Sequence, residues 1–173
     1  KVDTLNAKQS FIKHIADEDV AVAVDSGSFR ASSDFSEIQS VEAVIVCVPT
    51  PLGEHREPDI SYVLKSGEAI APHLQKGTLV VLESTTYPGT TEGPLKDALE
   101  KGSGLVAGTD FHLAYSPERE DPGRTDHSVA SIPKVVGGYT PACLEKAMSL
   151  YGKAVETPYP VHSCAVAEAC MLT

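Results

Sequence analysis

The stretch that decides the fold is Val41-Glu42-Ala43-Val44-Ile45-Val46-Cys47-Val48, which leads directly into Pro49-Thr50-Pro51. It is almost continuously apolar, as expected for a strand that is covered on both faces of a parallel sheet. Residues 78–83 and 111–115 have the same character, and residues 134–136 predict a further short strand. The core of the protein is therefore expected to be a sheet of buried strands.

Helical patterns separate these strands. Apolar residues at helical spacing predict helices over 60–74 and 91–100, the second ended by Gly102, and Thr140-Pro141 is a favourable start for a third. Alternation of strands and helices predicts an α/β fold, a doubly wound parallel (Rossmann-like) sheet. Such a sheet normally opens with a strand and a GxGxxG turn. This sequence has neither, so we expect the sheet to be incomplete at its N-terminus.

Composition excludes several classes of function. A length of 173 residues corresponds to about one domain. A net charge of −10 argues against binding to nucleic acid or to an anionic membrane. The four cysteines form no CxxC pair and the six histidines form no HxxxH or HxH pattern, so no metal site is predicted. The longest apolar run, residues 43–48, is too short to span a bilayer, and we expect a cytoplasmic protein.

Ligands on such sheets bind at the carboxyl ends of the strands, so the loops after the three buried strands are the candidate site. Thr50 lies between two prolines, which suits a rigid contact to a ribose or phosphate but also a stiff turn. The 84–91 loop has five hydroxyl side chains before a helix, which suits either phosphate binding or helix capping. Glu118 is a candidate general base and Arg119 a candidate phosphate partner; the alternative is a solvated surface pair.

Several motifs, in the same order along the chain, resemble those of the UDP-glucose/GDP-mannose dehydrogenase family. The sequences of residues 57–63 and 118–123 are most similar to the UDP-N-acetylglucosamine 6-dehydrogenase branch of this family, and the UDP-N-acetylmannosamine enzymes are the second most similar. The matching motifs are Val48-Pro49-Thr50-Pro51, Ser84-Thr85-Thr86-Tyr87-Pro88-Gly89-Thr90, Tyr115-Ser116-Pro117-Glu118-Arg119 and Pro133-Lys134-Val135-Val136-Gly137-Gly138. The resemblance implies NAD-dependent oxidation of the C6 alcohol of a UDP-sugar to the carboxylate. In the family, a cysteine in the C-terminal part holds the aldehyde as a thiohemiacetal.

The resemblance also assigns roles to individual residues. It implies that NAD is contacted by Val48, Pro49, Thr50, Ser84 and Thr85. Thr85 and Glu118 are implied to be catalytic, and Glu118 and Arg119 to contact the UDP-sugar. Residues 1–160 are then expected to be a partial NAD-binding domain, with 161–173 beginning a linker helix toward a central domain.

Departures from the family pattern change what is expected of the chain by itself. Met171 stands at the position of the family's catalytic lysine, and Cys164 and Cys170 do not match the nucleophile motif. We expect this chain to be a fragment that is inactive alone and binds NAD weakly. The alternative is a non-catalytic remnant that binds a nucleotide or a partner. An incomplete sheet exposes strand edges, so we also expect a homo-oligomer.

Overall fold

The computed structural model describes residues 1–53, 58–118 and 133–170. The chain divides into two compact units, Lys1–Ser36 and Glu37–Thr173. The first unit contains the short helices α1 (Val2–Asn6) and α2 (Asp17–Asp25). In it, the amide side chain of Asn6 donates to the carbonyl of Ala31 at 2.9 Å and accepts from the Ala31 N–H at 3.1 Å, so that the end of α1 is tied to the segment that follows α2.

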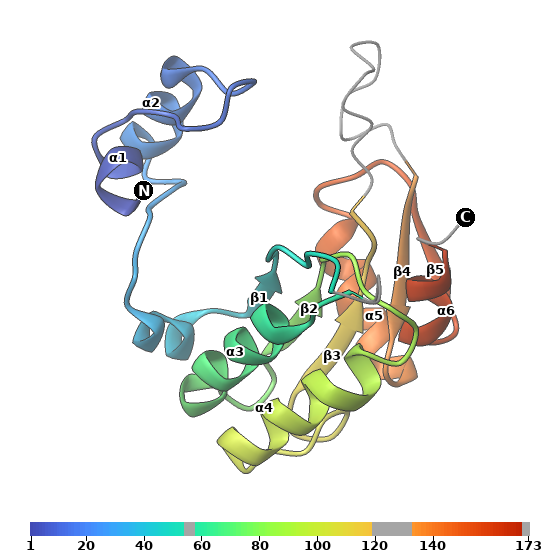
Figure 1. Ribbon diagram of the computed structural model, residues 1–173. Helices are drawn as coiled ribbons and strands as arrows, with labels where there is room; N and C mark the ends of the chain where they lie inside the picture. The colour runs from blue at the N-terminus through green and yellow to red at the C-terminus, as the bar shows by residue number, and fades with distance from the viewer. Residues whose placement is uncertain (54–57, 119–132, 171–173) are drawn as a thin grey trace. The chain divides into compact units, whose positions relative to one another are not determined.

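The second unit is built on a five-stranded sheet in the order β1-β2-β3-β4-β5 (Figure 1). The strands are β1 (Ala43–Val46), β2 (Leu79–Leu82), β3 (His112–Tyr115), β4 (Lys134–Gly138) and β5 (Pro158–Val161). Strands β1, β2 and β3 are parallel and in register, so that Val46, Leu82 and Tyr115 are neighbours at their carboxyl ends. The α/β fold with a mostly parallel sheet is therefore confirmed.

One strand pair departs from the predicted parallel arrangement, because β4 runs antiparallel to β3 and parallel to β5. The chain leaves β3 and enters β4 at the same edge of the sheet, where the Ser116 hydroxyl donates to the Val135 carbonyl at 2.8 Å. A strand that enters at the edge where its predecessor left has to run back. β5 was not predicted, since Pro158 and Pro160 interrupt the strand pattern. It is an outer strand of the described sheet, where proline is tolerated.

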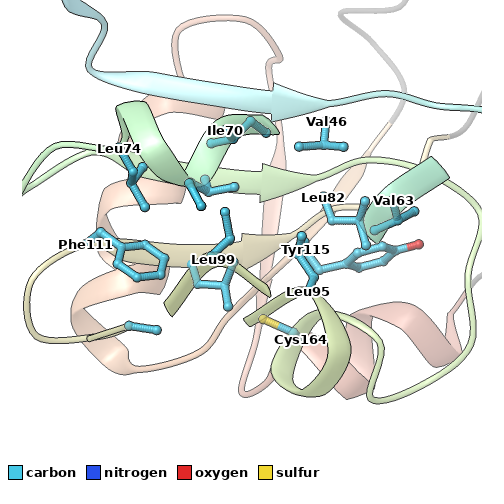
Figure 2. Close-up of a cluster of buried hydrophobic side chains, with 14 of the residues drawn as sticks. Val46, Val63, Ile70, Leu74, Leu82, Leu95, Leu99, Phe111, Tyr115 and Cys164 are labelled. Atoms are coloured by element: carbon cyan, nitrogen blue, oxygen red, sulfur yellow. The ribbon is translucent and has the colours of Figure 1, made fainter. Parts of the chain in front are cut away.

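Helices cover both faces of the sheet. One face carries α3 (Ser61–Ile70), η2 (Ala71–His73), the π-helix η3 (Thr91–Leu95), α4 (Lys96–Ser103) and α6 (Cys164–Ala169). Figure 2 shows the apolar cluster that they enclose, with Leu82, Leu95, Leu99 and Tyr115 at its centre and all fully buried. The other face carries α5 (Pro141–Tyr151). An additional short helix, η1 (Phe35–Ser40), precedes β1.

The glycine that ends α4 is Gly104, with φ +72°, and not Gly102 as predicted. Gly102 lies inside the helix, and a Cβ there would come within 2.6 Å of the Ala71 Cβ. The position therefore serves the close packing of α4 against η2. Thr140 caps α5 as expected, its hydroxyl accepting from the Cys143 N–H at 3.2 Å.

Candidate functional site

Ser84 joins the loop after β1 to the loop after β2. Its hydroxyl accepts from the Val48 N–H at 2.8 Å and donates to the Val46 carbonyl at 3.3 Å, and the side chain is 2% exposed. The Ser84 carbonyl in turn accepts from the hydroxyl of the fully buried Tyr115 on β3, at 3.2 Å. Ser84 therefore fixes the three strand ends to one another. Its predicted contact with NAD stays a prediction.

Two threonine hydroxyls of the 84–91 loop are used within the loop itself. Thr86 donates to Thr90 at 2.5 Å, and Thr90 donates to the Tyr87 carbonyl at 2.8 Å. Of the five serine and threonine side chains in the loop, four are buried and Thr85 is exposed, and the Tyr87 side chain is exposed as well. Thr85 is therefore the aliphatic hydroxyl of this loop that is open to solvent, and its predicted contact with NAD stays a prediction.

The start of the helix after this loop is occupied by a carboxylate from α6. Glu168 is fully buried and accepts hydrogen bonds from the Gly89 N–H at 2.5 Å, the Thr91 N–H at 2.9 Å and the Thr91 hydroxyl at 2.7 Å. Burial raises the pKa of Glu168 above its ordinary value, while the bonds from Thr91 and Gly89 act in the opposite direction. The donors at this helix start are therefore already satisfied, but by the Glu168 carboxylate and not, as the capping interpretation expected, by the loop's own serine and threonine side chains, since the N-cap Thr90 makes no side-chain cap bond.

The capping is reciprocal. Glu92, on η3, accepts from the N–H of Cys164 at 2.9 Å, and so caps the start of α6 together with the Ser163 side chain. Sequence analysis missed Glu168 because its partners lie 77 and 79 residues away. The only available signal was a carboxylate in an otherwise apolar segment near the end of the chain.

A second network, which we call the Lys134 cluster, consists of Glu83, Lys134 and Tyr151. The Lys134 ammonium forms an ion pair with Glu83 and donates to the Pro117 carbonyl at 3.3 Å. The Tyr151 hydroxyl donates to the other oxygen of Glu83 at 2.7 Å, and the ammonium lies 5.2 Å from the Tyr151 ring centroid. Burial, followed by the charge of Glu83, raises the pKa of Tyr151, so its hydroxyl remains a donor.

The remaining predicted residues follow the same strand ends. Val48 and Thr50 are half-buried, and Pro49 between them is exposed. Glu118 is exposed and directly follows the buried Pro117. Because β1, β2 and β3 are adjacent and parallel, Thr50, Thr85 and Glu118 all follow the carboxyl edge of the sheet. Arg119 lies outside the described residues.

Two cysteines of the described chain have unfavourable surroundings for thiolate chemistry. Burial raises the pKa of the Cys47 thiol, and the carboxylates of Glu83 and Glu118 raise it further. Burial also raises the pKa of the Cys164 thiol. Since the thiolate is the reactive form of cysteine, the surroundings of both thiols disfavour that form.

The described residues contain no group of three or more histidine, cysteine or acidic side chains placed to hold a metal ion. In the same part of the chain, none of the helices combines the length and apolar character needed to cross a membrane.

A mostly parallel α/β sheet whose loops gather at the carboxyl edge is the arrangement found in many nucleotide-binding domains. Comparison with known proteins specifies the class further. The sequence model of the NAD-binding domain of the UDP-glucose/GDP-mannose dehydrogenase family matches residues 1–155. The chain belongs to this family.

Several of its relatives are named as dehydrogenases of nucleotide sugars. UDP-N-acetyl-D-glucosamine 6-dehydrogenase of Pseudomonas aeruginosa is 40% identical over 158 residues, which are 87% of this chain and 37% of the relative. The crystal structure of NDP-N-acetyl-D-galactosaminuronic acid dehydrogenase from Methanosarcina mazei Go1 matches with a TM-score of 0.88 at 35% identity, over 98% of this chain and 37% of that one. The structure of UDP-D-ManNAc dehydrogenase from Pyrococcus horikoshii matches with a TM-score of 0.90 at 28% identity, over 99% of this chain and 41% of that one. The chain therefore spans about two fifths of the length of these relatives.

Proposed function

We propose that this chain is the NAD-binding part of a nucleotide-sugar 6-dehydrogenase that oxidises the C6 alcohol of a UDP-N-acetylhexosamine, UDP-GlcNAc or UDP-ManNAc, to the uronic acid. The observation that carries the proposal is the placement of Thr50, Thr85 and Glu118 after three adjacent parallel strands. Relatives named as UDP-N-acetyl-D-glucosamine 6-dehydrogenase and UDP-N-acetyl-D-mannosamine dehydrogenase support the same class of substrate.

The residues of the chain fit NAD at the strand ends. The exposed Thr85 hydroxyl and the half-buried Thr50 hydroxyl suit contacts to the ribose and nicotinamide, and Val48, Pro49 and Ser84 shape the backbone around them. The helix start at Thr91 does not fit a phosphate, because Glu168 already accepts from its N–H. When bound, NAD supplies the hydride acceptor of the oxidation.

Glu118 is the candidate acid–base group. Its exposed carboxylate stands next to the rigidly held Pro117 and can accept a proton from the substrate hydroxyl or order a water. Arg119 is proposed to contact the UDP-sugar beside it. The chain by itself is proposed to be inactive, since none of its cysteines matches the nucleophile motif that the resemblance implies.

The test is NADH production from UDP-N-acetylglucosamine and UDP-N-acetylmannosamine by a full-length protein that contains this chain. Glu118→Gln should lower kcat on the order of 10²-fold while the Kd for NAD changes little. Glu68→Gln, an exposed carboxylate of α3, is the matched control and should leave both values unchanged. The 173-residue chain should give no turnover, with or without Met171→Lys, and its Kd for NAD in calorimetry should be weaker than micromolar.

An unimpaired Glu118→Gln enzyme would refute the role assigned to this carboxylate. A full-length protein that binds a nucleotide but turns over no UDP-sugar would instead identify the second candidate, a non-catalytic binding module. The feature that favours this second candidate is Met171, which stands at the position of the family's catalytic lysine.

A further inference from the structure

Lys134 connects the two loops that carry the candidate catalytic groups. It lies at the start of β4, and its ammonium reaches the carboxylate of Glu83 at the end of β2 and the carbonyl of Pro117 at the end of β3. The side chains of Lys134 and Glu83 are only 15% and 16% exposed. The contact is therefore shielded from water and has a fixed geometry.

Each end of this connection leads directly into the candidate site. Glu83 immediately precedes Ser84 and Thr85, and Pro117 immediately precedes Glu118. Tyr151 holds the second oxygen of the Glu83 carboxylate, so the carboxylate cannot rotate away from Lys134 without losing that bond. A movement of the ammonium therefore changes the separation of Thr85 and Glu118.

We propose that Lys134 is a positioning residue that sets the Glu118 carboxylate relative to the Thr85 hydroxyl, a proposal that rests on the function proposed above. A half-buried ion pair contributes little net stability, because desolvation of its charges opposes their attraction. Geometry is the more sensitive quantity, since a displacement of about 1 Å among reacting groups lowers a rate about 10²-fold.

The kinetic test compares Lys134→Met with Lys96→Met in the full-length protein. Lys96 is the matched control because its side chain is 19% exposed and also forms an ion pair, with Glu100 at 2.9 Å, but on α4 and without contact to the strand ends. Lys134→Met should lower kcat at least tenfold and leave the Kd for NAD within twofold, whereas Lys96→Met should change neither. Lys134→Arg should recover part of kcat, because a guanidinium can still donate both to the Glu83 carboxylate and to the Pro117 carbonyl.

A spectroscopic test is independent of turnover. In protein labelled with ¹⁵N-threonine and ¹⁵N-glutamate, Lys134→Met should shift the amide signals of both Thr85 and Glu118, and Lys96→Met should shift neither. Unchanged signals, or a kcat that falls equally in the two variants, would overturn the positioning role. If the unmodified full-length protein oxidises no UDP-sugar, the proposed function fails, and the amide signals alone then decide whether Lys134 positions the two loops.

Discussion

Removing the Glu168 carboxylate should destabilise the protein far more than removing an ordinary surface acid. Glu168→Ala leaves three donors without an acceptor, namely the N–H groups of Gly89 and Thr91 and the Thr91 hydroxyl, and Thr91 is fully buried. An unsatisfied buried donor costs about 1–3 kcal/mol. Two effects reduce the total: the Thr91 hydroxyl can rotate to another acceptor, and the variant no longer has to bury a carboxylate. We therefore expect the free energy of unfolding to fall by about 3 kcal/mol.

The matched control is Glu92→Ala, which removes the acceptor of a single N–H, that of Cys164, and should cost about 1 kcal/mol. The free energy of unfolding is measured by urea denaturation followed by circular dichroism, since the chain has no tryptophan. A Glu168→Ala variant that loses less stability than Glu92→Ala would refute the view that this carboxylate caps the helix.

The pH dependence of stability tests the burial of the same carboxylate. The folded-state pKa of Glu168 lies above the ordinary value of 4.5, because burial disfavours the charged form. The folded protein then holds this proton more tightly than the unfolded chain, and the stability that the proton contributes is lost as pH rises from 4.5 through the raised pKa. The stability of the unmodified protein relative to Glu168→Gln should thus fall as pH rises above 4.5, and a relative stability that rises there would contradict the argument.

Three further predictions concern the loops, the packing and the sheet edge. Ser84→Ala should lower the free energy of unfolding by about 1–3 kcal/mol, measured by urea denaturation, because the part-buried Val48 N–H loses the hydroxyl that accepts its hydrogen bond. Gly138→Ala should abolish cooperative thermal unfolding, since its Cβ would lie 2.3 Å from the backbone nitrogen of Leu144, whereas Gly93→Ala, with no atom within 4 Å, should fold normally. Sedimentation should show self-association through the outer strand β1, and Ile45→Lys, at a side chain 44% exposed, should reduce it; a stable monomer would contradict this expectation.

The sequence was sufficient for those parts of the fold that depend on local pattern. The buried strands around Val46, Leu82 and Tyr115 are recognisable because each is a short apolar run, and the start of α5 because Thr140 and Pro141 have strong positional preferences. The direction of β4 has no such signal. It depends on the edge of the sheet at which the chain re-enters, and that is determined by tertiary contacts.

The same distinction holds for the candidate site. Thr50, Thr85 and Glu118 were predicted from motifs next to strand ends, and their common edge follows from parallel pairing. The groups that support them could not be predicted, because Lys134 and Glu168 bind partners 51 and 77 residues away in the sequence. The alternatives left open for the 84–91 loop could be separated only once the position of Glu168 was known.

The exchange of caps between η3 and α6 has a consequence for synthesis of the protein. The loop that presents Thr85 is completed by a carboxylate 77 residues farther along the chain, so its hydrogen bonds cannot form when the loop first leaves the ribosome. At about 5–20 residues per second, a nascent chain would wait on the order of 4–15 s for residue 168. During that interval the Gly89 and Thr91 N–H groups are open to other acceptors. A nascent chain stalled between residues 92 and 168 would therefore carry this loop without the carboxylate that caps it.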